Sequence, residues 1–155
     1  MSLLKTLGVA TAALMMTVPA VSFAQSERDV DQEEANKALV VEFYNQFFND
    51  HDTEQSAAVL AEDYIQHNPE VPDGRAPFVN YFAGYFEDNP EYKSEIVRSA
   101  ADGDLVWLHV HSTNGDKDQG EAVVDIFRVD DGKIVEHWDV IQSVPEEAAN
   151  DNTMF

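Results

Sequence analysis

The sequence predicts an α+β domain in which three N-terminal helices pack on one face of a curved antiparallel sheet. Apolar residues recur at helical spacing in the first half of the chain and at alternate positions beyond Tyr92. Short turns that contain Gly separate the alternating segments. Helices followed by closely connected strands are typical of helices packed on one face of an antiparallel sheet. With 155 residues, the chain has room for one such domain.

The N-terminus resembles a secretory signal. Lys5 is the only charged residue of the segment 1–24, and an apolar run and small residues precede Ala24. This pattern predicts a cleaved signal peptide over residues 1–24 and export to the periplasm or the extracellular space. The alternative is an uncleaved membrane anchor. A folded domain over residues 25–144 and an acidic, flexible tail over residues 145–155 would follow.

Three helices are expected in the first half of the mature chain. The segment 26–50 contains neither Gly nor Pro, Asp52 can cap a short helix over residues 53–61, and Pro77 suits the first turn of a helix that ends near Asn89. The first and third helices each present an aromatic face. The residues of these two faces are Phe43, Tyr44 and Phe47 in the first helix and Phe78, Tyr81, Phe82, Tyr85 and Phe86 in the third.

Four strands are expected in the second half, over residues 93–100, 105–112, 122–129 and 134–144. Their alternating apolar residues favour a sheet with one buried face. The intervening turns are Asp102-Gly103, Asn114-Gly115 and Asp131-Gly132. Because the connections are short, we expect successive strands to pair in antiparallel fashion.

The composition excludes several classes of function. Thirty acidic and nine basic side chains give a formal net charge of −21, which would repel the phosphates of a nucleic acid. The chain contains no Cys, which rules out disulfides, thiolate nucleophiles and Cys-ligated zinc. Any catalysis must therefore use His, carboxylates, Tyr or Ser.

The last predicted hairpin carries the most informative polar residues. A three-residue loop over 130–132 would place Asp125 opposite His137, with Asp139 on the same otherwise apolar face. A two-residue Asp131-Gly132 turn is the alternative, and it would separate the three side chains. Burying a carboxylate or an imidazole destabilises the folded protein unless the group is hydrogen-bonded, so an unbonded buried group indicates a function. The cluster is either a proton-transfer site or a satisfied Asp-His pair that fixes the strand register.

Two further groups of polar residues could lie near the same pocket. His67 and Asn68 precede Pro69, which favours extended or turn backbone and a position at a pocket mouth; a surface cap without chemistry is the alternative. The other group is His109-Val110-His111, whose distance from Gly103 in the sequence matches the start of a cupin metal motif. Because the rest of that motif is missing, we expect no metal and no cofactor, and one of these His side chains lining the pocket.

Three segments together resemble the SnoaL-like polyketide cyclases of the nuclear transport factor 2-like superfamily. They are Asp63 to Pro69 (DYIQHNP), Asp125 to Arg128 (DIFR) and Asp131 to Asp139 (DGKIVEHWD). The resemblance covers nearly all of residues 30–144. It implies a cone in which a bent sheet wraps around an apolar cavity closed by helices.

The resemblance also implies roles for individual residues. Asp139 matches the acid/base of an intramolecular aldol condensation, and His137 matches the His of the same motif. Asn68 corresponds to a polar residue of the pocket loop. Asp125 stands where characterised cyclases carry a pocket His. The side chains expected to contact substrate are Asn68, Tyr64, His109, Trp107, Phe127 and Phe82.

These observations predict an exported, cofactor-independent acid/base enzyme of the aldol-cyclase, isomerase or lyase type, acting on a small hydrophobic carbonyl compound. Asp139 would remove a proton α to the carbonyl, and His67, Asn68 or His137 would hold the enolate oxygen. One alternative is a non-catalytic carrier for an apolar ligand; another is a metal-dependent enzyme at His109 and His111. A homodimer is expected through the sheet face that carries Val124, Ile126, Trp138 and Val140.

Overall fold

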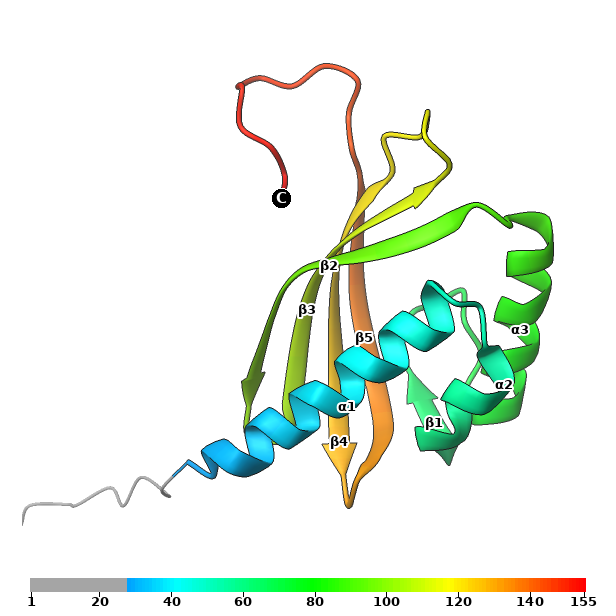
Figure 1. Cartoon of the computed structure of the whole chain (residues 1–155), viewed down its shortest axis with the longest axis vertical. Coiled ribbons are helices and arrows are strands. Elements are labelled where there is room, and N and C mark those ends of the chain that lie inside the picture. The colour runs from blue at the N-terminus through cyan, green and yellow to red at the C-terminus, as the bar shows by residue number, and fades with distance from the viewer. Residues whose placement is uncertain (1–27) are drawn as a thin grey trace, which may run out of the picture.

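The computed structural model describes residues 28–155 and shows helices packed against a curved five-stranded sheet (Figure 1). The predicted signal peptide at residues 1–24 lies outside the described residues. Within the described part of the chain, none of the helices combines the length and apolar character needed to cross a bilayer. The α+β class is confirmed, with differences in the helices and in the sheet.

The helices are α1 (Val30–Phe48), α2 (Thr53–Ser56) and α3 (Arg75–Asp88), and a 3₁₀ turn (Ala57–Val59) follows α2 directly. The side chain of Asp29 caps α1 by accepting a hydrogen bond from the Gln32 backbone N–H at 3.1 Å. The second helix is shorter than the predicted 53–61 because the chain becomes extended at Leu60.

The sheet contains one strand that the sequence did not predict, β1 (Leu60–Gln66). It pairs in parallel with β5 (Lys133–Ser143), so the sheet is mixed, and the expectation of an entirely antiparallel sheet was wrong. The predicted strands correspond to β2 (Tyr92–Asp102), β3 (Leu105–Asn114), β4 (Glu121–Asp130) and β5. Their order across the sheet is β1-β5-β4-β3-β2.

The turn between β4 and β5 differs from the predicted three-residue loop. Asp130 pairs with Lys133 around a two-residue turn, and Asp131 and Gly132 both have positive φ, 46° and 71°. A bulge next to Val129 then inserts one extra residue in β5. The tight turn alone would have moved the polar residues of β5 to the other face, and the bulge moves them back.

The consequence is a register two residues away from the predicted one. Asp125 lies opposite Asp139, and Phe127 lies opposite His137. The predicted pairing of Asp125 with His137 as cross-strand partners was therefore wrong. All four side chains still share one face because the shift is even.

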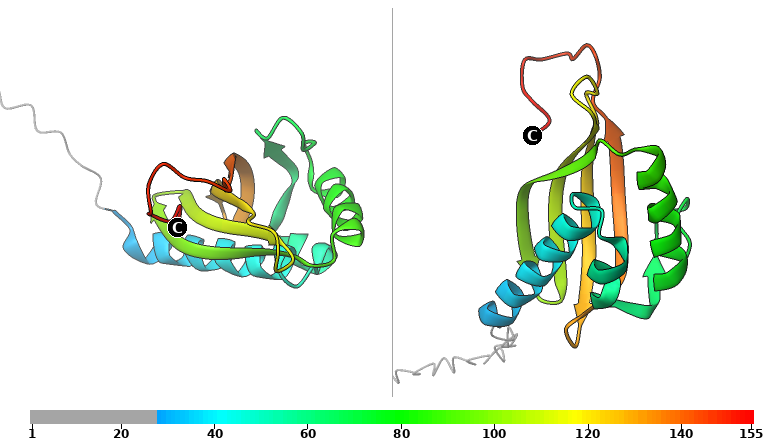
Figure 2. Two further views of the ribbon diagram at one scale, coloured as in Figure 1. Left: turned by 90° about the horizontal axis from the view of Figure 1, so that it is seen from above. Right: turned by 45° about the vertical axis from the view of Figure 1, so that its right-hand side comes forward.

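Helix α1 lies against one face of the sheet, and α3 lies at its β1 end (Figure 2). Between them lies an aromatic core that includes Phe43, Phe47 and Phe78 from the helices, all buried. The sheet contributes Val106, Leu108, Val110, Phe127 and Ile134. Because side chains alternate along a strand, the neighbours of these residues point to the outer face.

The tail beyond β5 has no helix or strand in residues 144–155, and it turns back toward the sheet (Figure 1). Its last residue, Phe155, stacks on the His111 ring with centroids 4.1 Å apart and lies 5.7 Å from the centroid of His109. The end of the chain therefore contacts the outer face of β3.

Candidate active site

A cavity of about 160 Å³ lies between the helices and the inner face of the sheet. Its apolar walls include Tyr44, Phe48, Phe78, Phe82 and Phe127. Polar groups come mainly from β1, β4 and β5 and the loop after β1: Tyr64, Gln66, Asn68, Asp125, His137 and Asp139. A small apolar pocket with a few convergent polar groups is the usual form of a ligand site.

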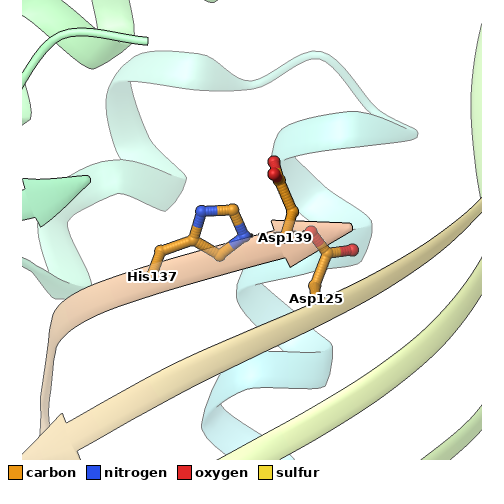
Figure 3. A group of neighbouring side chains, drawn as sticks. All are labelled: Asp125, His137 and Asp139. Carbon is orange, nitrogen blue, oxygen red and sulfur yellow. Dashed lines mark hydrogen bonds and ion pairs between the residues drawn. The ribbon is translucent and has the colours of Figure 1, made fainter. Parts of the chain in front are cut away.

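Asp125, His137 and Asp139 converge on this cavity from adjacent strands (Figure 3). The Asp125 and His137 side chains are buried and share a hydrogen bond of 2.9 Å between Oδ1 and Nε2. The Tyr44 hydroxyl donates to the other Asp125 oxygen, Oδ2, also at 2.9 Å. Both oxygens of Asp125 are thus engaged by neighbouring side chains.

The second ring nitrogen of His137 is also engaged. Nδ1 lies 2.9 Å from Oε1 of Gln66. An imidazolium would donate to both Asp125 and Gln66, and a neutral ring would donate to Asp125 while accepting from a rotated Gln66 amide. In either case the ring is fixed between two partners.

Asp139 is held differently from Asp125. It is half-buried, and its Oδ2 accepts a hydrogen bond of 2.7 Å from the Asn68 amide. Asn68 is itself oriented because its Oδ1 accepts from the Glu70 backbone N–H at 2.9 Å. No group among residues 28–155 bonds to the other Asp139 oxygen, Oδ1. Asp139 therefore combines a fixed orientation with a free carboxylate oxygen.

Tyr64 brings a phenol to the same cavity from β1. Its side chain is fully buried, and burial raises its pKa well above the usual value, with a further contribution from the charges of Asp125 and Asp139. Burial likewise raises the pKa of Tyr44, beside Asp125. Both phenols therefore stay protonated at neutral pH.

The structure brings together most of the predicted site residues. Asp125, His137, Asp139, Asn68, Tyr64, Phe127 and Phe82 all line the cavity. His67, His109 and Trp107 do not line it, so the expectation that they act on a ligand there was wrong.

His67 points to the outer side because it continues the alternation of β1, between the inward Gln66 and Asn68. Its backbone N–H donates to the His137 carbonyl, as a further rung of the sheet. Its ring stacks on Trp138, with centroids 4.6 Å apart, and Nε2 bonds to Glu136 at 2.8 Å. Hydrogen bonds from His67 and Arg128 lower the pKa of the Glu136 carboxyl. His67 therefore belongs to a hydrogen-bond network outside the cavity.

Trp107 and His109 lie on the outer face of β3. The inward positions of this strand are occupied by Val106, Leu108 and Val110. Trp107 is 40% exposed, and Nδ1 of His109 accepts a hydrogen bond from Arg98 at 2.9 Å. These two residues are on the wrong side of the sheet to reach the cavity.

Sequence reasoning missed two residues that hold the site. Tyr44 was placed on the aromatic face of the first helix, and its bond to Asp125 spans 81 positions of the chain, which no local pattern reveals. Gln66 lies between Tyr64 and Asn68 at alternate positions. That period of two was the signal that could have identified β1 and the three polar side chains it directs inward.

The same cluster has metal-ligating chemistry. Among the described residues, Asp125, His137 and Asp139 form the one group of His, Asp and Glu whose donor atoms come close enough to hold a cation, all within 4.8 Å of one another. Oδ1 of Asp125 and Nε2 of His137 already bond to each other, so a cation would have to replace that bond. His109 and His111 are not part of the group.

Comparisons with known proteins agree with the fold. Residues 40–137 match a family model described as a SnoaL-like domain. No curated protein gives a significant match.

Solved structures with the same fold include a candidate ketosteroid isomerase from Kribbella flavida, with 25% identity and a TM-score of 0.58 over 77% of this chain and 86% of that one. A SnoaL-like protein of unknown function from Burkholderia thailandensis aligns with 15% identity and a TM-score of 0.61, over 71% of this chain and 98% of that one. A candidate polyketide cyclase from Bacillus cereus aligns with 24% identity and a TM-score of 0.59, over 69% and 74%.

Proposed function

This chain belongs to the SnoaL-like domain family, and on that basis we propose that it is a general acid–base enzyme that acts on a small hydrophobic carbonyl compound. The observation that carries the proposal is the free Oδ1 of Asp139, which belongs to an oriented carboxylate beside the buried Asp125–His137 pair. A general base must be oriented and must have a free oxygen to accept the proton.

The two carboxylates have different roles in this proposal. Asp125 is an anchored anion, because Tyr44 and His137 occupy its two oxygens. Asp139 is the base: Oδ1 takes a proton from the carbon α to the carbonyl, and the electrons of that C–H bond form the enolate. Asn68 keeps the carboxylate of Asp139 in position through Oδ2.

The enolate can then react in more than one way. The proton can return to a different carbon, which is an isomerisation, or the enolate carbon can attack a second carbonyl, which is an aldol cyclisation. Both reactions need the same first step. The similar structures named as candidates for a ketosteroid isomerase and for a polyketide cyclase support this class of chemistry.

Cavity size and charge define the ligand. An engineered apolar cavity of about 150 Å³ binds benzene, so a cavity of about 160 Å³ suits a molecule of about one ring. Among the described residues, neither Lys nor Arg lines it, whereas Glu70, Glu121, Asp125 and Asp139 do. This charge disfavours anionic ligands, and we propose an uncharged carbonyl compound.

The test is exchange of the α hydrogens of small ketones in heavy water, which requires no knowledge of the natural substrate. The wild-type protein should accelerate exchange for at least one ketone of a panel that includes cyclopentanone, cyclohexanone and acetophenone. Asp139→Asn should lose about 10²–10⁴-fold of that acceleration. Asp130→Asn, at an exposed position at the end of β4, is the matched control. A protein that binds these ketones without accelerating exchange would be a carrier.

A further inference from the structure

One hydroxyl at the cavity lacks a partner. Within residues 28–155, the Tyr64 hydroxyl is the buried side-chain polar atom that makes no hydrogen bond. The Tyr64 side chain is 0% exposed. A buried donor without an acceptor destabilises the folded protein, and such groups are rare in native structures. A ligand atom that accepts this bond would remove the cost.

The other buried side-chain donors that line the cavity are already engaged. Tyr44 donates to Asp125, and His137 lies between Asp125 and Gln66. Asn68 is half-buried, and one N–H of its amide donates to Asp139. Tyr44 and His137 would each have to give up a bond to reach a substrate oxygen, but Tyr64 would gain one.

The Tyr64 ring is positioned for this task. It packs edge-on against Phe78, with centroids 5.4 Å apart, and its strand pairs with β5, which carries Asp139. The charges of Asp125 and Asp139 both act on its hydroxyl. A fixed, buried donor beside a base can stabilise negative charge as it develops on an oxygen.

We propose that the Tyr64 hydroxyl donates the hydrogen bond that holds the carbonyl oxygen of an uncharged substrate. This inference rests on the proposed function and names the oxygen-binding group of that site. While Asp139 takes the α proton, the C–H electron pair moves into the C–C bond and the carbonyl π pair moves to oxygen. Tyr64 stabilises the resulting oxyanion without giving up its own proton.

The experiment compares two probes of nearly equal shape, cyclohexanone and methylenecyclohexane, which carries a CH₂ group where the ketone carries oxygen. Binding is measured by titration for wild type, Tyr64→Phe and the control Tyr81→Phe, which alters another phenol of the same cavity. Tyr64→Phe should bind cyclohexanone about tenfold more weakly and methylenecyclohexane equally well. Tyr81→Phe should preserve the preference for the ketone.

Three results would overturn the inference. Tyr64→Phe could bind the ketone as tightly as wild type, or it could lose affinity for both probes equally, which would indicate a role in cavity shape. The third uses the wild-type protein alone: the infrared C=O band of bound cyclohexanone should lie at lower frequency than in cyclohexane, and an unshifted band would show that no donor reaches the oxygen.

These readouts are independent of turnover. If Asp139→Asn keeps full exchange activity, the proposed function fails while the ketone preference set by Tyr64 can persist. If the preference is absent but Asp139→Asn abolishes exchange, only the assignment of Tyr64 fails.

Discussion

Asp125 and Asp139 lie directly opposite each other on β4 and β5, yet each carboxylate has its own hydrogen-bond partners. Tyr44 and His137 hold both oxygens of Asp125, whereas Asn68 holds one oxygen of Asp139. Two like charges on adjacent strands repel, so these partners are what allow the pair to coexist in a largely buried site. The asymmetry between the two carboxylates leads to different predictions for each.

Replacing Asp125 should chiefly affect stability. Asp125→Ala leaves His137 and Tyr44 buried without their shared acceptor, so we expect the free energy of unfolding to fall by about 3 kcal/mol. Asp130→Ala, at an exposed position of the same strand, should change it by less than about 0.5 kcal/mol. Urea unfolding of the two variants measures the difference. Equal stability of both variants would show that the Asp125 network contributes nothing.

Stability should also fall at high pH. Burial raises the pKa of Tyr44, Tyr64 and Tyr92 above the usual value of 10.0. The folded state keeps these protons while the unfolded chain releases them. The stabilising contribution is therefore complete below the unfolded value and is lost as the pH rises through the folded-state pKa.

Tyr64→Phe provides the check on this pH dependence. Its free energy of unfolding should decline less steeply above pH 10 than that of wild type, since one fewer buried phenol ionises on unfolding. At neutral pH the variant should be as stable as wild type or more stable, because the hydroxyl has no partner to lose. A clear loss of stability at neutral pH would reveal a bond to Tyr64 that this account omits.

The outer face of the sheet leads to a prediction about assembly. It carries Trp107, Val124 and Val140, which are 40%, 39% and 71% exposed. We propose that this face forms a homodimer, since a group of exposed apolar side chains favours association. Light scattering at micromolar concentration should give the mass of a dimer for wild type and of a monomer for Val140→Glu. Val30→Glu, an equally apolar exposed position at the start of α1, is the control. A monomeric wild type would contradict the proposal.

Export remains a prediction of the sequence. If residues 1–24 are a cleaved signal peptide, the exported protein should begin at Gln25, and Ala24→Arg should block that cleavage. N-terminal sequencing of the protein recovered outside the cytoplasm measures this. Recovery of the full-length wild-type chain from the cytoplasm alone would refute export.

The strands β2 to β5 could be predicted because their alternating residues are strongly apolar and short turns bound them. β1 escaped prediction because only Leu60 and Tyr64 are buried along it, so its polar residues masked the period of two. Its parallel pairing with β5 joins residues about 70 positions apart. Such a contact depends on the packing of the whole domain and leaves no local signature.

Which residues form the site could be predicted better than how they are arranged. Asp125, His137 and Asp139 were placed on one face by a register that was wrong by two residues. A type of turn can be inferred from Asp131-Gly132, but the bulge beside Val129 depends on how the strand end packs. The prediction that His67 lies at the pocket was wrong for a related reason. The direction of its side chain depends on strand β1, which was not predicted.

The most direct test of the central claim is the exchange rate of cyclohexanone α hydrogens with saturating ketone, measured for wild type and Asp139→Asn together with the affinity of each protein for the ketone. The account predicts that Asp139→Asn binds the ketone with similar affinity and loses about 10²–10⁴-fold of the accelerated exchange. Exchange at the wild-type rate by Asp139→Asn would contradict the assignment of Asp139 as the base.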